Sequence, residues 1–431
     1  MNEPLQFDCE VAVVGAGPAG IAAATTAAEA GLPVVLVDDN PQPGGQIWRG
    51  ETKSSKQPAA ARWLSRLDAT SVRKIHSARV FHADQGNLFA ELSSGVVHVT
   101  FRKLIVAAGS RERFLPFPGW TLPGVVGAGG LQALVKAGLP VNGKRVVIAG
   151  TGPLLLAVAA LVVKHGASVV CIAEQTSLRR LARFGFSALL SKKSRDAAEL
   201  LWQLRGVPYW KNAWPVASLG ETAVERVQIS HNGAIQDLAC DYLAYGYHLV
   251  PSIELAQLLG CSLRDGFVVV DENQKTSIAG IYCAGEMTGI GGAERSLLQG
   301  QIAGYAAAGQ ISRAKGLLSK RDAFERHVRA LRKAFALRIE LKSLPQEKTL
   351  VCRCEDVTLG KLRLHNSWRL AKLQTRCGMG PCQGRVCGAA AQFLFGWDTG
   401  ETRPPVFPVS TSSLAAIAAG ASSESLQGEI Q

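Results

Sequence analysis

The pattern of apolar, glycine and polar positions near the N-terminus predicts a strand, a helix and a second strand. An apolar run at residues 10–14 is followed by a glycine-rich turn, an Ala-rich segment that reaches about residue 30, and a second apolar run at residues 33–37. Short apolar runs bounded by turns are typical of buried strands, whereas the longer Ala-rich segment favours a helix. This order predicts one βαβ unit of a parallel α/β sheet.

The glycine-rich turn of this unit has the residues that a dinucleotide requires. Gly15 permits a tight turn, Gly17 lets a pyrophosphate approach the backbone, and Gly20 lets the helix pack closely on the strand. The start of the helix offers free N–H groups and the positive end of its dipole to the phosphates. An acid at the end of the second strand can accept hydrogen bonds from a ribose. The residues predicted to bind the dinucleotide are Gly15, Gly17, Pro18, Ala19, Gly20, Asp38 and Asp39.

The same order of elements recurs at residues 145–173 with an altered turn. Gly150 and Gly152 are the predicted nucleotide contacts there, and Glu174 favours an unphosphorylated ribose. Leu155 stands where the third glycine belongs, so helix and strand lie further apart and NAD(P)H is less favoured. Two options stay open for this domain. It binds a smaller adenine nucleotide, ATP or ADP, or it serves only as a scaffold.

The charge of the chain is strongly basic, with 47 Lys and Arg against 34 Asp and Glu, a net charge of +13. Much of the excess lies at residues 179–195 and 313–333, and apolar residues recur at helical spacing in the second segment. We therefore expect solvated basic faces of helices, with steering of an acidic partner or substrate as the alternative. No aromatic-interleaved motif indicates nucleic-acid binding.

Hydropathy and the N-terminal residues predict a cytoplasmic protein. No uncharged apolar run reaches the roughly 20 residues that a membrane helix requires, because Gly, Pro or charge interrupts each candidate. Glu3, Asp8 and Glu10 lie where an export signal needs positive charge, and glycines interrupt the apolar stretch that follows. Association with a membrane through the respiratory chain is the alternative.

The ten cysteines fall into two groups. Five stand singly in apolar segments and are expected to be buried core thiols, whereas the other five lie between Cys352 and Cys387. Such a density of thiolates suits either a tetrahedral zinc site or an iron–sulfur cluster, and spacing alone does not decide between them. The chain contains no CxxC motif, so a thiol–disulfide enzyme is not expected.

Three further motifs resemble the flavin disulfide reductase superfamily. The loop after the first acid, LIVAAG at residues 104–109, and TSIAGIYCAGE at residues 276–286 occur in the order of that superfamily. The resemblance implies bound FAD. The contacts that it implies are Gly44, Gly45, Gln46, Ala108, Gly109, Gly285 and Glu286. Glu286 stands where the superfamily more usually has Asp, so its carboxylate must sit about one methylene further back.

The cysteine segment resembles a small helical [2Fe-2S] domain, that of bacterioferritin-associated ferredoxin. The similar stretches are CRCED at residues 352–356 and TRCGMGPCQGRVCG at residues 375–388. Over nearly its whole length the chain resembles the alpha subunits of bacterial opine, proline and D-hydroxyproline dehydrogenases, and it is also similar to the B component of hydrogen cyanide synthase. The resemblance implies a [2Fe-2S] cluster. Its implied ligands are Cys352, Cys354, Cys382 and Cys387, and Cys377 is spare because some relatives have alanine there.

Together the motifs predict an α/β fold. It has two Rossmann-like dinucleotide-binding domains in a glutathione-reductase-like arrangement, plus a small helical C-terminal [2Fe-2S] domain. The expected FAD domain is discontinuous, at residues 1–118 and 266–345, and the second nucleotide domain lies between its parts at residues 119–265. The cluster domain follows at residues 346–410, and residues 411–431 form an Ala/Ser-rich tail that is expected to be partly disordered.

The function that the resemblance implies is electron transfer within a complex. The chain is expected to relay electrons from an amine or amino acid that is oxidised on an FAD-containing beta subunit. Another expected partner is a small ferredoxin-like gamma subunit, and an FMN shared with one of the partners is an option. No histidine has a catalytic partner at a recognisable spacing, so no catalytic residue is identified. Two alternatives stay open: an NAD(P)H-dependent flavin reductase that feeds its own iron–sulfur centre, and an assembly scaffold.

Overall fold

The computed structural model describes residues 4–51, 57–188, 199–200, 202–400 and 402–417. Its internal contacts divide the chain into two compact units. Unit 1 holds the described residues within 1–111, 251–325 and 401–431, and unit 2 holds those within 112–250 and 326–400. The cysteine segment therefore belongs to unit 2, and the expected boundaries of a separate cluster domain stay a prediction.

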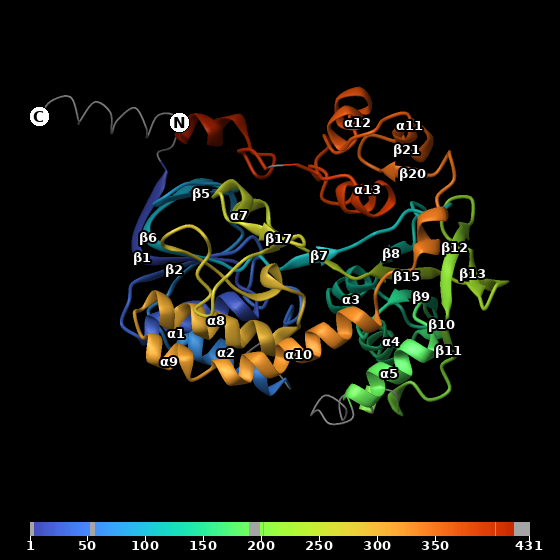
Figure 1. The fold of residues 1–431 in the computed structure, drawn as a ribbon, viewed down its shortest axis with the longest axis horizontal. Coiled ribbons are helices and arrows are strands. Elements are labelled where there is room, and N and C mark those ends of the chain that lie inside the picture. The colour runs from blue at the N-terminus through green and yellow to red at the C-terminus, as the bar shows by residue number, and fades with distance from the viewer. Residues whose placement is uncertain (1–3, 52–56, 189–198, 201, 401, 418–431) are drawn as a thin grey trace, which may run out of the picture. The chain divides into compact units, whose positions relative to one another are not determined.

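Unit 1 contains a seven-stranded sheet with the strand order β3-β2-β1-β6-β5-β4, in which β19 also pairs with β6 (Figure 1). β1 is parallel to β2 and β6, whereas β5 is antiparallel to β6. The strands in this sheet are β1 (Leu5–Val14), β2 (Val34–Val37), β3 (Arg73–Ile75), β4 (Arg79–Ala83), β5 (Asn87–Leu92), β6 (Gly95–Val106) and β19 (Ile281–Cys283). The consecutive residues Val11, Ala12 and Val13 are all fully buried, because one face of the sheet packs on α1 and α8 and the other face packs in a second apolar cluster that includes Leu255 and Val268.

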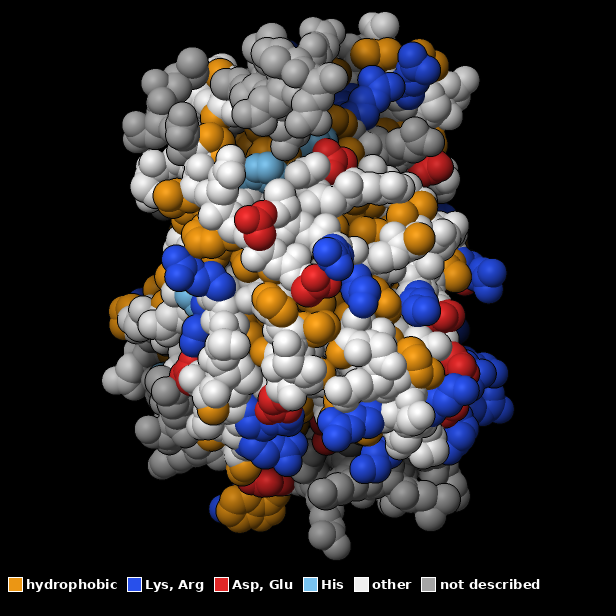
Figure 2. Space-filling view, turned by 90° about the vertical axis from the view of Figure 1, so that its left-hand side faces the viewer, with side chains coloured by type: hydrophobic (Ala, Val, Ile, Leu, Met, Phe, Trp, Pro, Cys, Tyr) orange, Lys and Arg blue, Asp and Glu red, His pale blue; other side chains and the backbone are white. Residues whose placement is uncertain are grey.

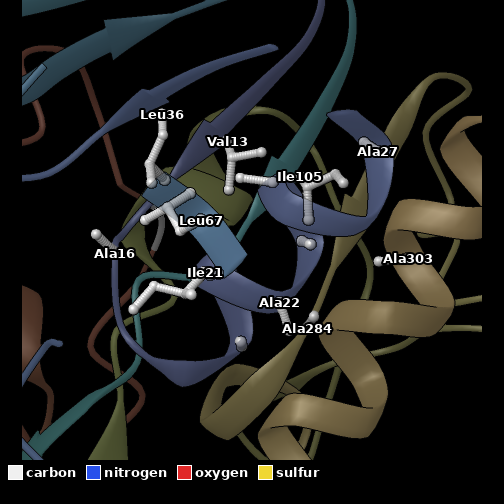
Figure 3. Close-up of a cluster of buried hydrophobic side chains, with 14 of the residues drawn as sticks. Val13, Ala16, Ile21, Ala22, Ala27, Leu36, Leu67, Ile105, Ala284 and Ala303 are labelled. Carbon is white, nitrogen blue, oxygen red and sulfur yellow. The ribbon is translucent and has the colours of Figure 1, made fainter. Parts of the chain in front are cut away.

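The helices of unit 1 include the predicted Ala-rich one, so the first βαβ unit is confirmed. This helix, α1, lies between the sheet and α8, with Ile21, Ala22 and Ala303 in one buried cluster (Figure 3). Outside the main sheet, unit 1 has α1 (Pro18–Glu29), α2 (Pro58–Asp68), α7 (Glu254–Leu258), β17 (Leu263–Arg264), β18 (Phe267–Val268), the 3-10 helix η1 (Gly285–Thr288), α8 (Ala293–Ala307) and α9 (Ile311–Lys315). Small side chains let α1 approach both neighbours closely.

Two glycines on α8 set the distance between α8 and α1. A Cβ atom at Gly304 would lie 2.7 Å from the carbonyl oxygen of Ala23. A Cβ atom at Gly300 would overlap the carbonyl oxygen of Ala19. The two helix backbones therefore touch at positions where any larger residue would separate them.

Unit 2 contains a five-stranded parallel sheet of order β11-β10-β9-β15-β8 and a three-stranded antiparallel sheet of order β12-β13-β14. β9 and β10 are parallel neighbours joined by α4, which confirms the second predicted βαβ unit. Leu155, in place of the third glycine, is buried in the core between them. The elements of this part are β8 (Val125–Gly127), α3 (Ala128–Lys136), β9 (Arg145–Thr151), α4 (Leu154–Lys164), β10 (Ser168–Glu174), α5 (Leu178–Ala188), β11 (Tyr209–Lys211), β12 (Ala213–Leu219), β13 (Arg226–His231), β14 (Ala234–Ala239) and β15 (Tyr242–Tyr247).

The cysteine segment of unit 2 is small and mainly helical. Its elements are the 3-10 helix η2 (Ile339–Ser343), β20 (Leu350–Cys352), β21 (Val357–Thr358), α11 (Leu359–Arg363), α12 (Trp368–Thr375) and α13 (Cys387–Phe395). Trp368 packs in a buried cluster with Cys377 and Cys387. Trp120 donates its indole N–H to the Leu350 carbonyl at 2.6 Å, which ties β20 to the rest of unit 2.

The chain passes between the units within three elements, β7 (Ser110–Glu112), β16 (Leu249–Pro251) and α10 (Leu318–Ala334). On α10 the predicted basic face is exposed at Arg326 and Arg329, while Val328 is buried. Residues 189–198 of the other predicted basic segment lie outside the described residues. On the face drawn in Figure 2, Asp and Glu lie among the Lys and Arg side chains. Among the described residues, no helix has both the length and the apolar character needed to cross a membrane.

The C-terminal segment returns to unit 1. Val406 donates its N–H to the Phe81 carbonyl at 2.7 Å, and Glu91 accepts from the Ser410 N–H at 2.9 Å and the Ser413 hydroxyl at 2.8 Å. Residues 411–417, part of the tail expected to be partly disordered, are helical. The remainder of that tail lies outside the described residues.

Replacing Gly300 by alanine is expected to destabilise the chain, because the added methyl group would overlap the Ala19 carbonyl and push α8 from α1. Overpacking of this kind costs about 1–3 kcal/mol. Thermal unfolding of the purified chain measures the loss. Gly316→Ala is the matched control, since a Cβ atom there lies 3.4 Å from its nearest neighbour. Equal melting temperatures for the two variants would contradict the role of Gly300.

Candidate functional site

The first glycine loop joins β1 to α1 in unit 1. Gly15 has a φ of +99°, and a Cβ atom there would overlap the Ala107 carbonyl oxygen, so this position requires glycine. A Cβ atom at Gly20 would overlap the Gly15 carbonyl oxygen. Gly17 is the N-cap of α1, Pro18 begins the helix, and no described side chain caps it. The backbone N–H groups at the start of α1 are therefore open to an anion.

Asp38 directly follows β2 and turns its carboxylate toward the glycine loop. Oδ2 accepts from the Ala16 N–H, and Oδ1 accepts from the backbone and side-chain N–H groups of Asn40 at 2.7 and 2.9 Å. Asp38 is 6% exposed, whereas Asp39 lies at the surface. Of the two predicted acids, only Asp38 is therefore brought against the loop.

The loop after this acid lies against the first glycine loop. Gly44 donates its N–H to the Ala16 carbonyl at 2.7 Å. A Cβ atom at Gly45, which has a φ of +59°, would lie 2.8 Å from the Gly17 Cα. The two backbones meet with no side chain between them. Gln46, the third predicted contact in this loop, is exposed.

The last flavin-like motif lies beside α1. Gly285 has a φ of +83°, and a Cβ atom there would lie 2.9 Å from the Cβ of Ala19. Glu286 follows it, and its carboxylate accepts from the N–H groups of Gly292 at 2.7 Å and Gly291 at 3.2 Å. The acid that the resemblance directs toward the ribityl chain is therefore engaged with the backbone that leads into α8.

The LIVAAG motif ends next to this acid. Ala108 is exposed and donates its N–H to the Met287 sulfur at 3.2 Å. Gly109 has a φ of +69°, and its carbonyl accepts from the Ser252 N–H at 3.0 Å. Segments far apart in the sequence thus converge on the start of α1.

Two polar side chains of α8 that sequence reasoning missed hold the last motif. Gln299 accepts from the Gly285 N–H at 2.9 Å. Arg295 is 3% exposed, donates to the Gly289 carbonyl at 2.7 Å and pairs with Glu325 at 2.5 Å. Arg295 and Gln299 stand four residues apart in the segment that follows the motif. This spacing was the available signal, because it places both side chains on one face of a helix.

The second glycine loop closes on its own acid. A Cβ atom at Gly150 would overlap the Gly246 carbonyl oxygen. Glu174 ends β10 and accepts from the Gly152 N–H at 2.7 Å and the Thr151 hydroxyl at 2.9 Å. Glu174 is 0% exposed, and burial raises the pKa of its carboxyl. Its carboxylate therefore faces its own loop, not solvent from which a ribose could approach.

The segment at residues 335–338 lies over this same loop. The Gln175 side chain, which is 0% exposed, donates to the Ala336 carbonyl at 3.3 Å and accepts from the Arg338 N–H at 3.1 Å. The Arg338 guanidinium lies 4.5 Å from the centre of the Trp214 ring. The chain's own backbone thus covers the residue that follows Glu174.

A further buried carboxylate, missed from the sequence, caps α3. Glu112 accepts from the Gly129 N–H at 2.8 Å and the Gly130 N–H at 3.0 Å, and burial raises the pKa of its carboxyl. A Cβ atom at Gly127 would overlap this carboxylate. Glu112 therefore occupies the anion position at the start of α3. Its partners are 17 and 18 residues away, beyond any local capping pattern.

The five cysteines of the C-terminal segment lie together. The sulfur atoms of Cys352, Cys377 and Cys387 lie within 4.8 Å of one another, and all three residues are buried. Half-buried Cys382 is hydrogen-bonded to Cys387 and to Cys354, which is exposed. The structure brings together the four predicted ligands and also places the predicted spare, Cys377, among them.

The electrostatics of these thiols favour ionisation at two positions. The neighbouring Cys377 and Cys387 thiols lower the pKa of Cys352 to about 2. The Cys387 thiol lowers the pKa of Cys382 to about 5. Thiolates are the form of cysteine that binds metals. The donor set therefore fits a thiolate-ligated metal or iron–sulfur centre.

Glycines make the turn around these thiols possible. Gly378 has a φ of +82°, and a Cβ atom there would lie 2.6 Å from the Trp368 ring. A Cβ atom at Gly380 would overlap the Cβ of Cys354. The glycines of the cysteine motif are thus required by close packing of the backbone on Trp368 and Cys354.

Comparisons with known proteins agree with this geometry. The sequence profile of the family described as pyridine nucleotide-disulphide oxidoreductase matches residues 9–312. The A component of opine oxidase from Rhizobium meliloti is 31% identical, over 94% of this chain and 97% of its own. The HcnB component of hydrogen cyanide synthase from Pseudomonas aeruginosa is 31% identical, over 87% of this chain and 90% of its own. Both relatives are named as subunits.

A solved structure is similar over nearly the whole chain. The crystal structure of L-proline dehydrogenase from P. horikoshii superposes with a TM-score of 0.67 at 20% identity, over 96% of this chain and 81% of that one. At this identity the likeness concerns the fold. The profile match and the glycine loop with its acid agree: the chain belongs to the pyridine nucleotide-disulphide oxidoreductase family and is an FAD-dependent oxidoreductase.

Proposed function

We propose that this chain is the FAD- and [2Fe-2S]-containing electron-transfer subunit of a flavin-dependent amine or amino-acid dehydrogenase complex. Its substrate is of the D-hydroxyproline, proline or opine type and is oxidised on a partner subunit. The observation that carries the proposal is the presence, in one chain, of the flavin family's glycine loop and five neighbouring thiols. The relatives from opine oxidase and hydrogen cyanide synthase are themselves named as subunits, which supports a complex.

The residues of unit 1 fit FAD. The uncapped start of α1 and the side-chain-free contact between Gly17 and Gly45 suit a pyrophosphate, and Asp38 suits a ribose. Bound FAD supplies the capacity to accept two electrons and release them singly. The protein positions that group through Gly285, which Gln299 holds beside α1.

The second nucleotide loop, in unit 2, favours an electron-relay function over an NAD(P)H-dependent reductase. An NAD(P)H-dependent enzyme needs an acid that the adenosine ribose can reach, whereas the segment at residues 335–338 covers the residue that follows Glu174. Leu155 is buried between the helix and the sheet, where a third glycine would allow a shorter distance between them. We therefore favour the scaffold role for this domain. ATP or ADP at this loop, which Leu155 leaves open, stays a prediction from the sequence, and so does an FMN shared with a partner.

Gly17→Ala is expected to weaken FAD binding at least about tenfold, because the new methyl group occupies the space of the pyrophosphate. The fold should tolerate it, since Gly17 has a φ of −76° and a Cβ atom there lies 4.0 Å from its nearest neighbour. Flavin content after dialysis, from the visible spectrum, measures the effect. Gly316→Ala serves as control, and full flavin retention in Gly17→Ala would place the cofactor elsewhere.

Cys354→Ser is expected to abolish the visible absorption of an iron–sulfur cluster, and Cys377→Ser to preserve it, because the proposed ligands are Cys352, Cys354, Cys382 and Cys387. The two variants form a matched pair, since each removes one of the five neighbouring thiols. Cys387→Ser is the positive control for loss. Iron content and electron paramagnetic resonance of the reduced chain provide the measurement. The reverse result would assign Cys377 as a ligand in place of Cys354.

The purified complex is expected to lose flavin absorption on addition of proline, hydroxyproline or an opine, and to keep it with NADH. The reason is that Glu174 and the covering segment at residues 335–338 leave a nicotinamide nucleotide no open ribose site. Anaerobic spectra measure both additions. Rapid bleaching by NADH in this chain alone would favour the reductase alternative, and turnover that survives removal of the cluster would favour a scaffold.

A further inference from the structure

The cysteine segment has several exposed apolar side chains within a short stretch of sequence. Twelve large hydrophobic residues are exposed among those the structure describes, and three of them fall within residues 364–373. Leu364 is 82% exposed, Leu370 is 44% and Leu373 is 59%. Single exposed leucines need no explanation, but a local group of them marks a surface that is covered in an assembly.

The sequence segment that carries these leucines is basic. Between Asp356 and Asp398 the chain has six Lys and Arg residues and no acidic residue. Arg369 lies at i−4 from Leu373, so these two side chains share one face of α12, and Arg376 is the residue at which the helix ends. Arg369 is exposed and makes no ion pair with any described residue. We call Arg369, Leu370, Leu373 and Arg376 the α12 face.

The α12 face adjoins the solvent-exposed edge of the cysteine cluster. Arg376, at the end of α12, pairs with Glu355 at 2.8 Å, and Glu355 follows Cys354 directly. Cys354 is the exposed member of the five cysteines, while Cys352, Cys377 and Cys387 are buried. A protein that covers the α12 face therefore comes close to Cys354, the most exposed of the five clustered cysteines.

We propose that the α12 face is the docking surface for an acidic electron-transfer protein, whose own face carries Asp and Glu around an apolar centre. This inference rests on the proposed relay function and names the partner's chemistry. Complementary charge steers such partners into encounter, and the apolar centre supplies the binding free energy. The position beside Cys354 favours a redox protein over a membrane surface, which requires no neighbouring redox centre.

The test uses the complex purified through a tag on this chain, produced with its partner subunits. Leu370→Glu and Leu373→Glu should each weaken retention of one acidic, redox-active partner at least about tenfold. Arg369→Glu should weaken it mainly at low salt, because charge steering is screened at about 0.5 M ionic strength. Ile235→Glu on β14 is the matched control, since Ile235 is 54% exposed and lies in unit 2 outside the cysteine segment. Native mass spectrometry measures retention, and the visible spectrum shows that flavin and cluster are intact.

The outcomes separate this inference from the proposed function. Loss of the acidic partner in the α12 variants, with flavin and cluster intact and Ile235→Glu unaffected, supports it. Retention of every partner at unchanged salt dependence overturns the docking surface and leaves the relay standing. Loss of binding to anionic phospholipid vesicles, or of self-association, in place of partner loss also overturns it. A wild-type chain that purifies with no partner and accepts no electrons from an amine removes the proposed function itself.

Discussion

The close approach of α1 to its surroundings is the constraint on which the rest of unit 1 depends. Gly20 brings the helix against the Gly15 carbonyl, and Gly300 brings α8 against the Ala19 carbonyl. Side chains at either place would lift α1 away and move its first N–H groups. Those N–H groups have no described side-chain cap, so the helix presents a site for negative charge. Tight packing thereby fixes where the phosphates of a dinucleotide have to lie.

The two glycine loops have the same local sequence pattern but different surroundings. Each has an acid after its second strand, and each acid accepts an N–H from its own loop: Asp38 from Ala16 and Glu174 from Gly152. The difference lies in what covers them. Gln175 binds the segment at residues 335–338, a contact between residues about 160 positions apart. A carboxylate that is buried in this way is costly to ionise unless hydrogen-bonded, and Glu174 has those bonds internally.

Much of the fold followed from local patterns, because hydrophobic periodicity and glycine position report directly on strands, helices and tight turns. Both βαβ units were predicted from them, and so was the gathering of cysteines. The site residues that the sequence did not predict contact partners far away along the chain. Glu112 caps a helix that starts 16 residues later, and Arg295 forms an ion pair with Glu325. No local signal reveals such partners. Spacing likewise could not show that Cys377 would lie among the predicted ligands, because packing on Trp368 brings it there.

Basic residues lie close to the thiol cluster. Hydrogen bonds from neighbouring thiols lower the pKa of Cys352 and of Cys382, which favours the thiolate form at these two positions. Arg376 ends α12 beside Cys377, and Arg385 donates to the Cys382 carbonyl at 3.3 Å. Cations near buried thiolates offset their charge and bias the redox centre that they hold. Arg369 and Lys372 continue the basic character along α12, where they favour an acidic protein. On the proposed function, redox tuning and partner choice would both depend on basic residues of this one segment.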